Sequence, residues 1–125
     1  MKDNTLNKTI YFIDDEPDIL EAVKIILEDA GYDVKVAQYL TSVNEIASFS
    51  PKLIILDALL KGQSGPNICM SLKKNASTQN IPVLLLSALP MAKLKQMVVE
   101  CGAMGYLQKP FELDTLVSTV KKYLA

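Results

Sequence analysis

The sequence contains no histidine and no tryptophan, and only two of its 125 residues are cysteines. Without histidine the chain cannot carry a Ser-His-Asp or Cys-His catalytic site, a histidine metal ligand or a phosphohistidine of its own. The two cysteines, Cys69 and Cys101, do not form a CxxC motif. We expect them to be free, buried thiols in a reducing compartment, with a disulfide or a zinc site as the alternative.

Long apolar runs and an excess of basic charge are also missing. The longest apolar runs, such as LIIL at 53–56 and VLLL at 83–86, are far too short to span a bilayer. The first residues, MKDNTLNK, are polar and unlike a signal peptide, so we expect a cytoplasmic protein without membrane contact. A formal net charge of -1 argues against a nucleic-acid surface in this chain.

The composition of the chain is that of one folded domain. Half of the residues are hydrophobic and 22% are charged, which is typical of a globular protein. The length suits a single core, and no repeat, low-complexity segment or Pro/Gly-rich linker divides the chain. We therefore predict one domain over residues 1–125.

Apolar segments alternate with amphipathic ones along the whole chain. Period and composition predict strands over 9–14, 32–37, 52–57, 81–88 and 104–108. Helices are expected over 17–30, 43–49, 66–75, 91–101 and 112–124. Buried parallel strands need helical crossovers on both faces of their sheet. The pattern therefore predicts a three-layer, doubly wound α/β fold of the (βα)5 type, with a five-stranded parallel sheet.

Charged or hydroxyl side chains occur where four of these strands end. They are Asp14, Asp15 and Glu16 after the first strand, Asp57 at the end of the third, Ser87 in the fourth and Lys109 after the fifth. Ligands bind at the carboxyl ends of strands in such sheets. Aspartates without histidine or cysteine make a hard-oxygen site of the kind that Mg²⁺ prefers. Together with a lysine and a hydroxyl group, the set predicts phosphoryl transfer with a carboxylate as the acceptor.

Each of these residues also has an ordinary structural interpretation. Asp14 and Asp15 would suit the start of a helix as solvated acids, and Asp57 alone would suit a cap. Ser87 would suit the end of a strand, and Lys109 would suit the surface as a solvated charge. Their common position at neighbouring strand ends favours the functional interpretation.

In these features the whole chain resembles the receiver domain of two-component response regulators. The resemblance rests on the acidic pair Asp14-Asp15, on the segment DALLKGQSG in which Gly65 follows Asp57 by eight residues, on Ser87-Ala88, on Lys109-Pro110 and on Tyr106 three residues before the lysine. It implies a flavodoxin-like, chemotaxis-type fold with strand order 2-1-3-4-5. It also implies a cis peptide bond between Lys109 and Pro110.

The resemblance implies a phosphorylation-dependent signalling switch. Asp57 would accept a phosphoryl group from a phosphohistidine on a sensor histidine kinase or phosphotransfer protein. Mg²⁺ would be the cofactor, bound by Asp14, Asp15, Asp57 and the backbone carbonyl of Leu59, and Glu16 would tune the site. Such a domain catalyses its own phosphorylation and dephosphorylation and is not a turnover enzyme.

The resemblance also assigns roles to residues beyond the metal ligands. Lys109 and Ser87 would contact the phosphoryl group, and Ser87 and Tyr106 would move as a switch, although half-buried packing is the alternative for Tyr106. Signal output, and a possible homodimer, would use residues 91–124, whose methionines suit either a core or a partner surface. The sequence leaves the target or output domain unknown, and the chain would be either a stand-alone receiver or part of a longer regulator.

One position departs from the family, because Lys61 stands where relatives usually have proline. Two other functions are alternatives to the switch. A phosphorylation-independent, receiver-like interaction adaptor would not need the complete set of site residues. A magnesium phosphohydrolase with an aspartyl nucleophile would carry a DxD-type motif and a cap domain, and this chain has neither.

Overall fold

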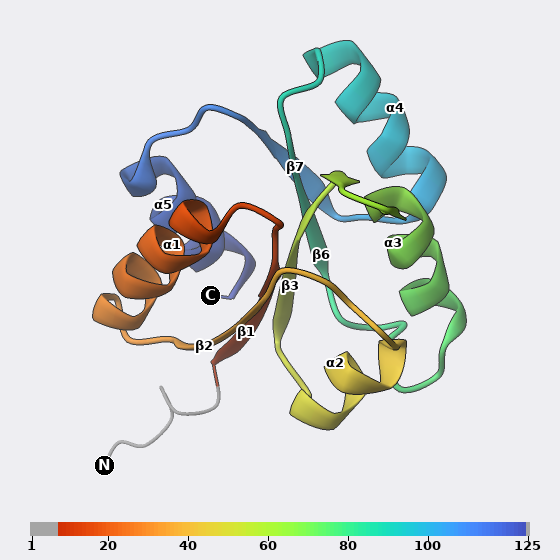
Figure 1. Ribbon diagram of the computed structural model, residues 1–125, viewed down its shortest axis with the longest axis horizontal. Helices are drawn as coiled ribbons and strands as arrows, with labels where there is room; N and C mark the ends of the chain where they lie inside the picture. Colours follow the sequence, from red (N-terminus) through yellow and green to blue (C-terminus); the bar gives the residue numbers. More distant parts are fainter. Residues whose placement is uncertain (1–7, 125) are drawn as a thin grey trace.

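A parallel sheet between two layers of helices forms the protein (Figure 1). The structure, a computed structural model, describes residues 8–124. Residues 1–7 and 125 lie outside the described part. Two predictions therefore fall mainly outside the described residues. They are the polar N-terminus without a signal peptide and the two ends of the 1–125 domain.

The sheet has the predicted topology. Its strands are β1 (Thr9–Ile13), β2 (Asp33–Ala37), β3 (Leu53–Asp57), β6 (Val83–Ser87) and β7 (Gly105–Gln108). The helices are α1 (Pro17–Asp29), α2 (Val43–Phe49), α3 (Gly65–Lys74), α4 (Met91–Cys101) and α5 (Leu113–Tyr123). Neighbouring strands are all parallel in the order β2-β1-β3-β6-β7, which is the predicted order 2-1-3-4-5. The fold prediction is confirmed.

The alternation of side chains along β1 explains why the sheet is covered on both faces. Ile10 and Phe12 pack in one core cluster with residues of α1 and α5, whereas Tyr11 and Ile13 pack in a second cluster with residues of α2, α3 and α4. Figure 1 shows these two helical layers on opposite sides of the strands. The sheet therefore has an apolar core on each face, as continuously apolar strands require.

Local sequence signals place several helix ends. Pro17 occupies the first turn of α1, where its missing N–H costs no helical hydrogen bond. Ser42 caps α2 through a reciprocal capping box with Glu45. Gly102, with φ of 84°, ends α4 in the left-handed conformation that glycine adopts without strain.

A small hairpin lies in the segment between β3 and α3, where no strand was predicted from the sequence. Two-residue strands β4 (Leu59–Leu60) and β5 (Gln63–Ser64) pair antiparallel across a turn. Gly62, with φ of 74°, occupies the turn position that requires a left-handed backbone. Strands of two residues are too short to produce a readable alternation, so the pattern did not reveal them.

Both cysteines are free and buried, as predicted. The thiol of Cys69 lies 3.3 Å from the carbonyl oxygen of Cys101, between α3 and the end of α4. Over the described residues, none of the helices combines the length and the apolar character needed to cross a membrane.

Candidate functional site

The strand ends bring the predicted site residues to one edge of the sheet. Asp14 directly follows β1, and its backbone N–H extends the sheet by donating to the carbonyl of Ala37 at 3.1 Å. Asp57 is the last residue of β3. Lys109 directly follows β7, and its N–H donates to the carbonyl of Ser87 at 2.7 Å. Parallel strands end on the same edge, so residues far apart in the sequence meet there.

Lys109 binds three carboxylates at this edge. Its Nζ lies 2.8 Å from Asp14 Oδ2, 3.2 Å from Asp57 Oδ2 and 3.2 Å from Glu16 Oε1. Asp14 is completely buried and Asp57 is 4% exposed. Buried carboxylates that lack a cationic partner are strongly destabilising, so the ammonium group is a condition for the cluster to exist.

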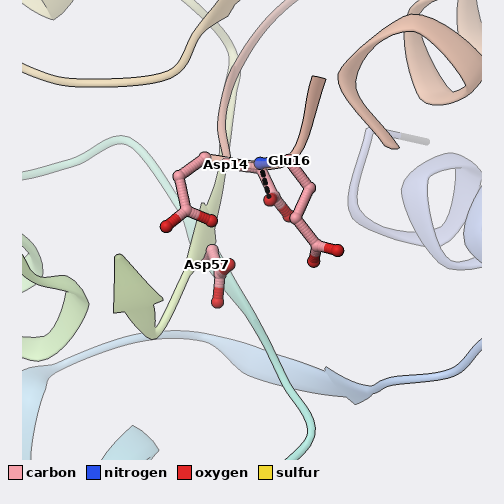
Figure 2. Close-up of side chains that lie close together, drawn as sticks. Asp14, Glu16 and Asp57 are labelled. Carbon is pink, nitrogen blue, oxygen red and sulfur yellow. Dashed lines mark hydrogen bonds between the residues drawn. The ribbon is translucent and has the colours of Figure 1, made fainter. Parts of the chain in front are cut away.

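Glu16 is more closely integrated than the sequence indicated. Its backbone N–H donates to Asp14 Oδ1 at 2.9 Å, and this bond is drawn in Figure 2 with the carboxylates of Asp14, Glu16 and Asp57 close together. Its own side chain is exposed, and it shares the ammonium group of Lys109 with the two aspartates. The resemblance implied only a tuning role for Glu16, because nothing local shows that its carboxylate reaches the lysine that follows the last strand.

The surroundings shift the ionisation of the two central groups. Burial raises the pKa of Asp57, and the nearby charge of Asp14 raises it further, while the N–H of Leu59 and the charge of Lys109 act in the opposite direction. Desolvation lowers the pKa of Lys109, but the hydrogen bond and charge of Asp14, followed by those of Asp57, outweigh it and raise the pKa overall. Lys109 therefore stays protonated, whereas the surroundings of Asp57 disfavour its charged form.

The segment after β3 is hydrogen-bonded to two of the acidic residues. The N–H of Leu59 donates to Asp57 Oδ1 at 3.0 Å, and the N–H of Lys61 donates to Asp15 Oδ2 at 2.9 Å. Gly65 lies so close to this segment that a Cβ on it would come within 2.5 Å of the carbonyl oxygen of Asp57. The glycine eight residues after Asp57 therefore has a steric cause.

The carboxylates present a donor set that fits Mg²⁺. One oxygen each from Asp14, Asp15, Glu16 and Asp57 can be chosen so that all lie within 4.8 Å of one another. All four donors are hard oxygens, and Asp15 and Glu16 are partly or fully open to solvent. Mg²⁺ prefers oxygen ligands and keeps several waters, which an open edge allows. The cluster has four carboxylates and only three of them contact the one ammonium group, so negative charge is left for a cation to neutralise.

The remaining predicted residues lie near this edge or farther along its strands. Ser87 is buried at the end of β6, beside β3, and its Oγ accepts from the N–H of Leu89 at 3.0 Å. Tyr106 is half-buried in β7 and packs against the core cluster on the α2–α4 face. The peptide bond between Lys109 and Pro110 is cis, as the resemblance implied. The structure thus joins Asp14 and Asp57 directly to Lys109, while the switch roles of Ser87 and Tyr106 stay predictions.

Comparison with known proteins identifies the family. The model of the response regulator receiver domain matches residues 10–121. The chain is 38% identical over 116 residues to the DNA-binding dual master transcriptional regulator RpaA of Synechocystis sp., covering 92% of the chain and 48% of that protein. It is 36% identical over 120 residues to the phosphate regulon transcriptional regulatory protein PhoB of Pseudomonas aeruginosa, covering 95% of the chain and 52% of that protein.

Solved structures of response regulators are also similar to this chain. A putative response regulator from Chloroflexus aurantiacus superposes with a TM-score of 0.86 at 33% identity, covering 94% of this chain and 97% of that chain. The chemotaxis response regulator CheY4 of Vibrio cholerae superposes with a TM-score of 0.84 at 26% identity, covering 93% and 98% of the two chains. The chain belongs to the response regulator receiver domain family, whose general function is that of a phosphorylation switch in two-component signalling. It spans about half the length of the curated relatives named above.

Proposed function

We propose that this receiver works as a switch by accepting a phosphoryl group on Asp57. The donor is a phosphohistidine of a sensor histidine kinase or phosphotransfer protein, acting in the cytoplasm. The observation that carries the proposal is the position of Asp57, a carboxylate with 4% exposure at a strand end, 3.2 Å from the ammonium group of Lys109. The chain modifies itself in this reaction and is not a turnover enzyme.

The transfer is a displacement at phosphorus. An oxygen of the Asp57 carboxylate forms a bond to the phosphorus atom, and the bond from phosphorus to the imidazole nitrogen breaks, with its electron pair returning to the imidazole. Asp57 becomes an acyl phosphate. Lys109 neutralises charge on the phosphoryl oxygens, and the hydroxyl of Ser87 donates to one of them after it leaves the N–H of Leu89.

The donor set at the strand ends supports Mg²⁺ as the cofactor. Asp14, Asp15, Asp57 and the backbone carbonyl of Leu59 would hold the ion. When bound, it supplies positive charge beside the phosphoryl oxygens. Asp14 and Asp57 already share Lys109, so the protein's own contribution is to hold these carboxylates together before any ligand arrives.

The output surface of the switch is the face formed by α4, β7 and α5, residues 91–124. Val99 and Met104 on this face are 82% and 59% exposed, which supports a partner contact or a homodimer there. Movement of Ser87 towards the phosphoryl group, followed by Tyr106, would connect Asp57 to this surface. No nucleic acid contacts this chain in the proposed function, and the partner or output domain that reads the face is not specified by it.

The test is the intact mass of the protein after incubation with Mg²⁺ and a small phosphodonor, such as acetyl phosphate. We expect one added phosphoryl group on the wild-type chain and none on Asp57→Ala. Asp33→Ala, which removes an exposed aspartate at the start of β2, is the matched control and should be modified like wild type. If the wild-type chain gains no mass and also fails to bind beryllofluoride with Mg²⁺, the phosphorylation-independent adaptor becomes the better proposal.

A further inference from the structure

We propose that Gln63 is a positioning residue that holds the segment 58–64 against the acidic site by pairing with the backbone of Leu40. The inference rests on the proposed function of the site and adds a residue to it. Gln63 does not touch the reacting atoms. It acts through the segment that contacts Asp15 and Asp57.

The side-chain amide of Gln63 and the backbone of Leu40 form two hydrogen bonds with each other. The side-chain Nε2 of Gln63 donates to the carbonyl of Leu40 at 2.6 Å, and the N–H of Leu40 donates to Gln63 Oε1 at 3.0 Å. Leu40 is 5% exposed, so its backbone groups have little access to water. A primary amide offers a donor and an acceptor in the plane that such a pairing needs. A glutamate at this position would place a carboxylate against the Leu40 carbonyl, and an alanine would leave both backbone groups unpaired.

The segment that Gln63 belongs to has little rigidity of its own. Residues 58–64 contain no proline, and Gly62 adopts a φ of 74° in the middle of the turn. The hairpin consists of two strands of two residues each. A hairpin this short is at best marginally stable, so its position depends on contacts with the rest of the protein.

Two of those contacts end on carboxylates of the site. The N–H of Lys61 donates to Asp15, and the N–H of Leu59 donates to Asp57. Both carboxylates are the ones that a cation and a phosphoryl group would engage, so these two bonds compete with the ligands of an occupied site. The pairing of Gln63 with Leu40 uses no site carboxylate and is free of this competition. It is therefore suited to keep the backbone of Leu59 and Lys61 in place while their other partners change.

Loss of the Gln63 amide should loosen this segment without dismantling the sheet. The purely structural alternative is that Gln63 only satisfies the buried backbone of Leu40. That role would lower the stability of the whole domain but would leave the site unchanged in the folded protein. The two explanations differ in what happens at Leu59 and Lys61, whose amides do not contact the Gln63 side chain.

The experiment compares wild type, Gln63→Ala and Gln63→Glu by amide hydrogen exchange and by Mg²⁺ titration followed by NMR, well below the unfolding temperature. Gln96→Ala is the matched control, because Gln96 also makes a side-chain hydrogen bond, to Glu100 on α4, far from this segment in the sequence. We expect faster exchange of the Leu59 and Lys61 amides in both Gln63 variants and a dissociation constant for Mg²⁺ that rises about tenfold. Gln96→Ala should match wild type in both measurements.

Unchanged exchange at Leu59 and Lys61 in the Gln63 variants would overturn the proposal, whatever the metal does. Unchanged Mg²⁺ affinity together with a uniformly lower free energy of unfolding would establish the structural role instead. Failure of the proposed function gives a different result. In that case the wild-type chain gains no phosphoryl group, while the exchange at Leu59 and Lys61 still responds to Gln63.

Discussion

The ammonium group of Lys109 lies 2.8 Å from the carboxylate of Asp14, a residue that precedes it by 95 positions in the chain. The same group lies 3.2 Å from Asp57. One cation at the end of the last strand therefore compensates the buried acids at the ends of the first and the third. This pairing allows a negative cluster to exist at the edge of an apolar sheet.

Replacing Lys109 should impair both the stability and the chemistry of the site. We expect Lys109→Ala to slow phosphorylation of Asp57 about 100-fold, because a charge that faces the phosphoryl oxygens is removed. The free energy of unfolding should also fall by about 1–3 kcal/mol at neutral pH, since Asp14 and Asp57 remain buried without the ammonium group. Rates of phosphorylation by mass spectrometry and denaturant unfolding measure the two effects. Lys93→Ala, on exposed α4 surface, should leave both unchanged, and a Lys109→Ala rate equal to wild type would contradict the assignment.

Gly65→Ala tests whether the close contact with the backbone of Asp57 requires glycine at position 65. The new Cβ would lie 2.5 Å from the carbonyl oxygen of Asp57, so the start of α3 has to shift. We expect a loss of about 1–3 kcal/mol in the free energy of unfolding, although alanine alone would favour a helix. Ser71→Ala, at an exposed position of the same helix, controls for helix propensity. A Gly65→Ala protein as stable as wild type would show that the contact relaxes easily.

Binding of Mg²⁺ should be visible as a stabilisation of the folded chain. At a concentration ten times its dissociation constant, the ion should add about 1.4 kcal/mol to the free energy of unfolding, because it binds the folded state alone. Asp15→Asn should remove most of this gain, and excess chelator should reverse it. Asp18→Asn, at an exposed acid in the first turn of α1, serves as the comparison. An equal gain in the Asp15 and Asp18 variants would remove Asp15 from the metal site.

The capping box of α2 should give the protein a pH-dependent component of stability away from the site. The hydrogen bond from the Thr41 side chain and those from the N–H groups of Thr41 and Ser42 hold the pKa of Glu45 below its ordinary value. A carboxyl group with a lowered folded-state pKa stabilises the protein above its unfolded-state pKa and loses this effect as the pH falls through the folded-state pKa. Glu45→Ala should therefore destabilise the protein at neutral pH and have a smaller effect in strong acid.

Urea unfolding at a series of pH values measures this difference. Glu21→Ala, at an exposed position of α1, is the matched control. If the effect of Glu45→Ala were the same in acid as at neutral pH, the charge of Glu45 would have no part in the cap.

Much of the fold and of the site could be predicted because the signals are local. A run such as LIILD predicts that β3 is buried on both faces. The parallel topology then places the last residue of the strand at the carboxyl edge of the sheet. The same reasoning places Asp14 and Lys109. Their convergence follows from the order of strands, so it required no knowledge of individual contacts.

Other features depend on contacts between segments that no periodicity connects. Nothing in the local sequence identifies Leu40 as the partner of Gln63, or Lys109 as the partner of the Glu16 carboxylate. The β4–β5 hairpin is likewise too short to have a pattern. Local sequence was thus sufficient for the five strands of the main sheet, the five helices and the identity of the acids. The partners of those acids and the anchoring of the 58–64 segment arise only in three dimensions, because hydrogen bonds over such sequence distances depend on how the whole chain packs.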